Sequence, residues 1–260
     1  MIYEITNLNN VSPLFGKWEE TIIWSCLQGV MGKVYADDLG NPTAAMAILG
    51  DFSFFAGTPN PELVSYKPDW YTQDSMIMVP QNEDWKNAIV QSYGNKAKIV
   101  SRYATKKEPD IFDKEKLEAA VSSLPSGYQI RMIDEPLYQM CKAETWSADL
   151  VSQFQTYEDY RRLGLGAVIL KDNAIVSGAS SYSRYWTGIE IEIGTRKDYR
   201  RQGLAYACGA KLILECLKRN LYPSWDAQNL GSLALAEKLG YRYSHEYEAV
   251  EVAGQYKILN

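Results

Sequence analysis

The segment Tyr199–Ala205, Y-R-R-Q-G-L-A, constrains the fold of this chain more than any other stretch. Before it, Ile189–Thr195 alternates isoleucine with glutamate, as in a β-strand, and after it the apolar residues of Arg201–Arg219 recur at helical spacing. A strand, a turn with a glycine and a long helix leave backbone N–H groups without a helical partner at the turn, together with the positive end of the helix dipole. Such a turn can bind a phosphate, although an ordinary helix start with two solvated arginines is the alternative.

The residue types of this turn suit an anion. Gly203 has no Cβ to keep a phosphate away from the backbone, and Ala205 carries the next-smallest side chain. Arg200 and Arg201 add cationic donors. The turn is neither a Walker loop nor a G-x-G-x-x-G dinucleotide loop, because the glycine spacing of both is absent.

A second motif, Asn229–Tyr241, follows after a helix and a short strand and reads N-L-G-S-L-A-L-A-E-K-L-G-Y. It resembles the N-x-x-S/A-x-x-L-Y-x-K-x-G-F/Y segment of the GNAT superfamily of N-acetyltransferases, and Arg200-x-x-Gly203-x-Ala205 resembles the Q/R-x-x-G-x-G/A signature of the same superfamily. Two motifs in this order are more specific than either alone, and the resemblance covers about Tyr128–Val252. W-D-A-Q-N and I-E-I-E-I further resemble the branch named for zwittermicin-A-resistance acetyltransferases, as do V-Y-A-D-D and S-R-Y-A-T-K-K-E-P in the first half.

The resemblance implies acetyl-CoA as the cofactor and assigns residues to it. Main-chain amides of the turn would hold the pyrophosphate, and the backbone of the preceding strand would align the pantetheine arm. The asparagine and serine of the second motif often contact the same arm, while Asn229 also has the structural role of a favoured N-cap. The implied positions are Ile193, Gly194, Thr195, Arg200, Arg201, Gln202, Gly203, Leu204, Ala205, Asn229 and Ser232.

Transfer of an acetyl group to an amine requires a base that takes a proton from the amine. Glu190 and Glu192 alternate with isoleucines, which places both carboxylates on one face of the strand and the isoleucines on the other. Glu192 lies three residues before Thr195, where many GNAT enzymes carry a catalytic glutamate, so it is the first candidate and Glu190 the second. A solvated or ion-paired strand face is the alternative. The tyrosine that usually protonates the departing thiolate is replaced by Ala236.

The order of the expected elements predicts an α/β (α+β) protein with two domains. Residues 126–260 are expected to form a GNAT fold, in which helices flank a mixed, mostly antiparallel central sheet, and residues 1–125 an N-terminal α/β domain. Leu124–Gly127, L-P-S-G, is the expected boundary. The pattern of the second half also predicts a hairpin of Ala167–Leu170 with Ala174–Tyr182 and a last strand at Tyr256–Leu259.

The first half has a similar order of elements, which makes it a candidate degenerate copy of the GNAT fold. Lys33–Asp38 and Ala44–Phe55 are interpreted as two strands of one hairpin. Ser75–Val79 and the helix Glu83–Tyr93 then take the place of Ile189–Thr195 and its turn, without an R-x-x-G motif.

Composition limits the function classes. The formal net charge of −5 argues against a dedicated nucleic-acid binder, and no stretch approaches the ~18 apolar residues of a membrane-spanning helix. The 4 cysteines form no C-x-x-C pair and the only histidine is His245, so we expect no metal site. Cys208 and Cys216 fit small core residues, and we expect a reduced, cytoplasmic protein.

The leading hypothesis is an acetyl-CoA-dependent N-acetyltransferase, monomeric or homodimeric, that acts on a primary amine of a small molecule. An antibiotic is one candidate acceptor. A non-catalytic acyl-CoA-binding or regulatory protein is the alternative, motivated by Ala236 and by the first half. Acetylation of a protein or peptide terminus is a third hypothesis. No motif identifies the acceptor.

Overall fold

A computed structural model describes residues 1–253 of the chain, which divides into two compact units. Of the described residues, unit 1 comprises 1–102 together with 246–253, and unit 2 comprises 103–245. The predicted boundary at Leu124–Gly127 lies inside unit 2, because the preceding helix α5 (Lys114–Ser122) packs against α9 (Leu204–Lys218). The predicted strand Tyr256–Leu259 lies outside the described residues.

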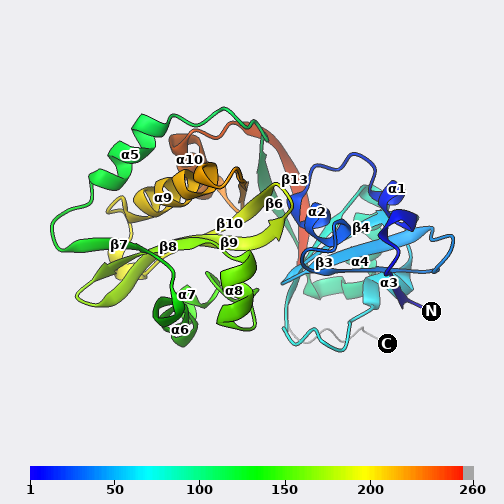
Figure 1. The fold of residues 1–260 in the computed structure, drawn as a ribbon. Coiled ribbons are helices and arrows are strands. Elements are labelled where there is room, and N and C mark those ends of the chain that lie inside the picture. Colours follow the sequence, from blue (N-terminus) through cyan, green and yellow to red (C-terminus); the bar gives the residue numbers. More distant parts are fainter. Residues whose placement is uncertain (254–260) are drawn as a thin grey trace. The chain divides into compact units, whose positions relative to one another are not determined.

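Unit 2 is built around a sheet with the strand order β11-β10-β9-β8-β7 (Figure 1). Neighbouring strands are antiparallel except β10 and β11, which are parallel. Helices cover both faces of the sheet, so the structure confirms the predicted fold class. Besides α5 and α9, the elements are β7 (Tyr128–Met132), α6 (Glu135–Ala143), α7 (Thr145–Ala148), α8 (Tyr157–Leu163), β8 (Gly166–Lys171), β9 (Ala174–Tyr185), β10 (Gly188–Thr195), η3 (Lys197–Tyr199), β11 (Tyr222–Ser224), β12 (Asp226–Ala227), α10 (Leu230–Leu239) and the start of β13 (Tyr243–Val252).

Strands β8 and β9 form the predicted hairpin, and a two-residue turn sets their register. Asp172 and Asn173 have positive φ angles of 49° and 62°. This backbone matches the twist of antiparallel strands, and Asp and Asn tolerate it better than other residues with a side chain. Lys171 therefore pairs with Ala174 across the turn.

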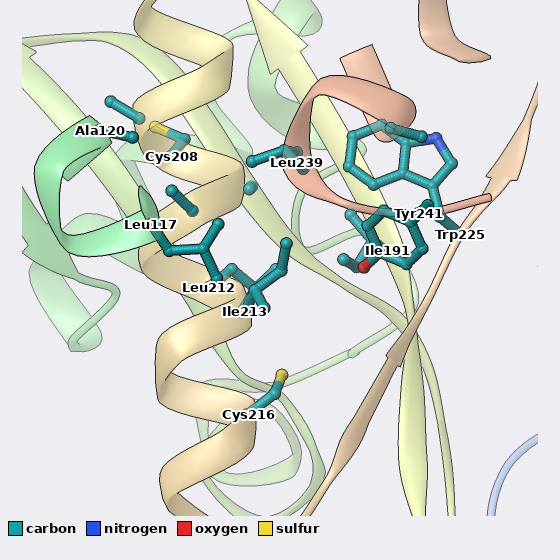
Figure 2. Close-up of a cluster of buried hydrophobic side chains, with 14 of the residues drawn as sticks. Leu117, Ala120, Ile191, Cys208, Leu212, Ile213, Cys216, Trp225, Leu239 and Tyr241 are labelled. Atoms are coloured by element: carbon teal, nitrogen blue, oxygen red, sulfur yellow. The ribbon is translucent and has the colours of Figure 1, made fainter. Parts of the chain in front are cut away.

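Helix α9 covers one face of this sheet and carries the core of unit 2 (Figure 2). Its buried residues pack with Leu239 of α10, and Gly209 permits this contact because a Cβ there would lie 2.8 Å from Cδ1 of Leu239. Cys208 and Cys216 are free and buried in this core, and burial raises the pKa of both thiols to about 12. The structure thus confirms their predicted role as small packing residues.

Helices α6, α7 and α8 cover the opposite face of the sheet (Figure 1). Tyr160 of α8 shares a 2.9 Å hydrogen bond with the Ser180 hydroxyl on β9, and Tyr138 of α6 donates to the carbonyl oxygen of Phe154 at 2.7 Å. The first bond holds α8 to the sheet, the second holds α6 to the segment between α7 and α8, and α7 contacts β9 and β10. No helix within residues 1–253 is long and apolar enough to cross a membrane.

Unit 1 has the same topology as unit 2. Its strands follow the order β1-β2-β3-β4-β5, antiparallel except for the parallel pair of β4 with β5. Helices follow β1, β4 and β5, as they follow β7, β10 and β11 in unit 2. The elements are β1 (Tyr3–Glu4), η1 (Leu8–Asn10), α1 (Ser12–Phe15), α2 (Thr21–Leu27), β2 (Lys33–Ala36), β3 (Ala44–Leu49), β4 (Phe52–Gly57), α3 (Pro61–Ser65), β5 (Met76–Pro80), α4 (Glu83–Tyr93), η2 (Gly94–Lys96) and most of β6 (Ala97–Thr105).

The predicted correspondence between the two halves is wrong by one strand. Ala44–Phe55 is two strands, β3 and β4, because Gly50 turns the chain at φ 58°. As a result β5 and α4 correspond to β11 and α10, and β4 with α3 takes the place of β10 with α9. The caps agree with this alignment, since Asn82 begins α4 as Asn229 begins α10.

The chain crosses between the units twice, each time within a strand. Strand β6 begins in unit 1, and its residues Tyr103 and Ala104 pair with β12 in unit 2. Strand β13 begins in unit 2, and its residues 250–252 pair with β5 in unit 1. Each unit therefore includes a strand segment that enters from the other half of the sequence.

Candidate functional site

The predicted phosphate-binding turn contains two residues in left-handed conformations. After β10 and η3 the chain reaches Arg201 at φ 61° and Gly203 at φ 79°. Gly203 is the N-cap of α9, and no side chain caps this helix. The N–H of Ala207 donates to the carbonyl of Gly203, so the N–H groups before it lack a helical acceptor and are available to an external one. The turn has the geometry of an anion-binding helix end.

The side chains around this turn have distinct positions. Nε of Arg200 donates to the carbonyl oxygen of Thr195 at 3.3 Å, which closes the loop between β10 and α9. Arg201 and Gln202 are exposed at the surface. Leu204 is buried in the core and anchors the first turn of α9, so its contribution to an anion site is its backbone.

Strands β10 and β11 separate beside the turn. Their parallel pairing ends at Glu190, opposite Ser224, while β10 continues to Thr195. Beyond Ser224 the chain joins β6 instead, where Asp226 pairs with Ala104. The pairing of β10 with β9 also shifts register directly after Glu190, which marks a bulge at the same level. We call this point the fork; beyond it, a strand edge of this kind can bind an extended ligand.

One candidate glutamate lies at the fork and the other lies beyond it. Glu190 is buried at the fork, 7% exposed, and its Oε1 accepts the N–H of Asp226 at 2.8 Å. Glu192 is half-buried, opposite Ser180 of β9, in the part of β10 that has left β11. The isoleucines that alternate with them pack with α9, as the alternation predicts: Ile189, Ile191 and Ile193. Glu190 thus ties the parting strands together, whereas Glu192 lies in the segment beyond them.

Asn229 and Ser232 form part of the start of α10. Oδ1 of Asn229 accepts the N–H of Ser232 at 2.9 Å, which confirms the predicted N-cap. The hydroxyl of Ser232 accepts the indole N–H of Trp225 at 3.1 Å. Both side chains therefore have structural roles here, and their contact with a ligand stays a prediction.

Ala236 is fully buried in the core of unit 2, and the N–H of Tyr241 donates to its carbonyl oxygen at 3.1 Å. This position of α10 therefore supplies no hydroxyl. His245 lies exposed in β13, where its Nδ1 is 3.1 Å from the hydroxyl oxygen of Ser244.

The structure adds residues that no motif indicated. Trp146 of α7 lies next to Gly194. A Cβ added at Gly194 would lie 3.6 Å from the Trp146 carbonyl oxygen and 3.9 Å from its ring. Ser183 and Ser224 flank Glu190 on the two neighbouring strands, and within residues 1–253 their buried hydroxyls have no hydrogen-bond partner. These contacts join distant segments, so no local spacing signals them.

In unit 1, β4 and α3 correspond to β10 and α9, and the unit's own side chains use the backbone groups at the end of β4 and the start of α3. The N–H of Gly57, at the end of β4, donates to Oε1 of Gln81 at 3.0 Å, and Trp85 donates to the Gly57 carbonyl at 2.9 Å. The short helix α3 begins with Pro61, which has no N–H, and Asn60 caps it by accepting from the next two amides. The N-terminus of α3 therefore offers no free set of donors comparable to that of α9.

Comparison with known proteins shows the family to which this chain belongs. A family model described as GNAT acetyltransferase matches residues 12–250, which span both units. The crystal structure of a GCN5-related N-acetyltransferase-like protein from Streptococcus suis 89/1591 is similar, with a TM-score of 0.89 and 48% identity over 94% of this chain and 97% of that chain.

Two more distant proteins are also similar to this chain. The uncharacterized N-acetyltransferase YdfB of Bacillus subtilis (strain 168) is 27% identical over 248 residues, 89% of this chain and 90% of that protein. A tandem GNAT protein from the clavulanic acid biosynthesis pathway shares the fold, with a TM-score of 0.51 and 10% identity over 88% of this chain and 84% of that chain. With the family match across most of its length, the chain belongs to the GNAT acetyltransferase family and is an acyltransferase.

Proposed function

We propose that this protein is an acetyl-CoA-dependent N-acetyltransferase that acetylates a primary amine of a small molecule by direct attack in a ternary complex. The observation that carries the proposal is the uncapped start of α9 at the end of the loop that follows β10, with Glu192 in the β10 segment between the fork and this loop. The amides of residues 200–205 suit the pyrophosphate, and the backbone of Ile193–Thr195 suits the pantetheine arm. Asn229 and Ser232 lie at the start of the neighbouring helix.

In the proposed reaction the residues of the site have separate roles. Bound acetyl-CoA supplies the acetyl group: the amine nitrogen forms a C–N bond to the carbonyl carbon, the C–S bond breaks, and the thiolate leaves with the electron pair. Glu192 takes the proton that the amine loses. Glu190 holds β10 to the backbone of Asp226, which keeps the fork in place. Because Ala236 supplies no hydroxyl, the departing thiolate is released without a tyrosine at this position.

Thiol release from acetyl-CoA in the presence of a panel of primary amines tests the activity. We expect amine-dependent release, with one product acetylated at nitrogen by mass spectrometry, and cationic small amines are the first acceptors to try because the chain is acidic. Tight binding of CoA without release for any amine would favour the alternative, a non-catalytic acyl-CoA-binding protein. Ala236 is the observation that motivates this alternative.

An antibiotic is the proposed kind of acceptor. The support is the resemblance of W-D-A-Q-N and I-E-I-E-I to the branch named for zwittermicin-A-resistance acetyltransferases. The free, buried cysteines fit a reducing compartment, which agrees with a cytoplasmic location for such an enzyme.

We also propose that unit 1 is a degenerate copy of the fold that binds no acetyl-CoA. Gln81 and Trp85 use the backbone groups of Gly57, and Asn60 uses the amides of α3. Isothermal titration should therefore give one acetyl-CoA per chain, and Gly203→Val should abolish that single binding event. A stoichiometry of two, or residual tight binding in the variant, would contradict this role of unit 1.

A further inference from the structure

The turn before α9 has a conformation that needs support from outside. Arg201 has a side chain yet adopts φ 61°, a conformation that is strained for a residue other than glycine. The N-cap does not supply the support, because Gly203 has no side chain to bond the first amides of the helix. The bond of Arg200 to the Thr195 carbonyl lies within the loop itself, so support from outside the loop has to come from another element.

Tyr128, at the start of β7, makes this contact. Its hydroxyl donates to Oε1 of Gln202 at 3.0 Å, between residues 74 positions apart in the sequence. Its ring also meets the ring of Tyr199 edge-on, with the centroids 6.4 Å apart at an angle of 84°. Tyr128 thus touches the turn on both sides of Arg200–Arg201, through Tyr199 before them and Gln202 after them.

Tyr128 is itself held in place by the sheet. It pairs with Lys171 across β7 and β8, and the Lys171 ammonium lies 5.0 Å from the centre of the Tyr128 ring. The N–H of Tyr128 donates to the carbonyl of Pro125 at 3.2 Å. A residue held within the sheet thus contacts the turn before α9.

We infer that Tyr128 is a positioning residue for acetyl-CoA binding, which acts by holding Gln202 and so the left-handed turn at Arg201–Gly203. This inference rests on the proposed function of the turn as the pyrophosphate site. Tyr128 touches the turn rather than the reacting atoms, so its loss weakens binding of the donor and leaves the chemical step unchanged.

Tyr128→Phe removes the hydroxyl and keeps the ring. Loss of one neutral hydrogen bond predicts an increase in the Kd and KM for acetyl-CoA of roughly three- to tenfold, with kcat and the KM of the acceptor unchanged. Gln202→Ala, at an exposed position, should have the same effect, and the double variant should add nothing further. Tyr157→Phe is the matched control, because its ring also packs on another tyrosine, with centroids 5.7 Å apart, far from this turn in the sequence.

The outcomes separate this inference from the proposed function. If the wild-type protein binds acetyl-CoA and Tyr128→Phe and Gln202→Ala bind it equally tightly, the positioning role is wrong and the proposed function stands. A fall in kcat with an unchanged KM for acetyl-CoA would also overturn it. If the wild-type protein does not bind acetyl-CoA, the proposed function fails and this inference fails with it.

Discussion

Gly203→Val should abolish acetyl-CoA binding, raising the Kd by about 100-fold or more. Gly203 has φ 79°, where a β-branched residue is strongly disfavoured, so the turn must change shape and its amides turn away from the pyrophosphate. Loss of two hydrogen bonds to a charged group, at about 1.5–3 kcal/mol each, accounts for this factor. Titration calorimetry with acetyl-CoA measures the effect.

Gly16→Val is the matched control for this substitution. Gly16 lies in unit 1 at φ 59°, and a Cβ at either Gly16 or Gly203 would meet no atom within 4 Å. Both variants should lose about 1–3 kcal/mol of unfolding free energy to backbone strain, but only Gly203→Val should lose acetyl-CoA binding. Equal binding by the two variants would show that the turn is not the pyrophosphate site.

Glu192→Gln should lower kcat by about 10²- to 10⁴-fold, the usual contribution of a general base, and leave the Kd for acetyl-CoA unchanged. Glu192 is half-buried in the segment beyond the fork, where we propose that it takes the proton of the amine. Steady-state kinetics with the best amine, together with acetyl-CoA titration, gives both quantities.

Glu190→Gln and Glu190→Ala complete this experiment. The carboxamide can still accept the N–H of Asp226, so Glu190→Gln should keep most of the turnover. Glu190→Ala removes that buried acceptor and should lower the free energy of unfolding by about 1–3 kcal/mol, measured by urea denaturation. Full activity in Glu192→Gln with none in Glu190→Gln would exchange the roles of the two glutamates.

Turns with special backbone conformations decide how much of this fold the sequence predicts. Asp172-Asn173 was recognisable as a two-residue turn because polar residues favour positive φ, and the hairpin around it is confirmed. Gly50-Asp51 is also a two-residue turn, with a positive φ at Gly50 alone, but apolar residues on both sides made Ala44–Phe55 resemble one long strand. That missed turn shifted the predicted correspondence between the halves by one strand. A Gly-Asp pair between apolar runs was the available signal.

In the candidate site, too, the sequence predicts the parts that depend on neighbouring residues and misses the parts that depend on distant ones. The turn at Gly203 and the Asn229 cap depend on neighbours in the sequence, so residue types and spacing predict them. The fork depends on where β11 leaves β10, and the bond that marks it joins Glu190 to Asp226. The hydrogen bond from the Gly57 N–H to the Gln81 side chain likewise connects separate elements. Such contacts arise from tertiary packing, and they leave no recognisable spacing of residues in a single sequence.

The exchange of strand segments sets an order for the folding of this chain during synthesis. The edge of β5 pairs with residues 250–252, and Met76 is opposite Val252. This edge is therefore covered only after Val252 has been synthesised. Unit 1 is synthesised first but completes its sheet only after unit 2 has left the ribosome. Until then β5 presents an unpaired edge, the kind of surface on which nascent chains aggregate. The N-terminal half therefore keeps an open strand edge until β13 has been made.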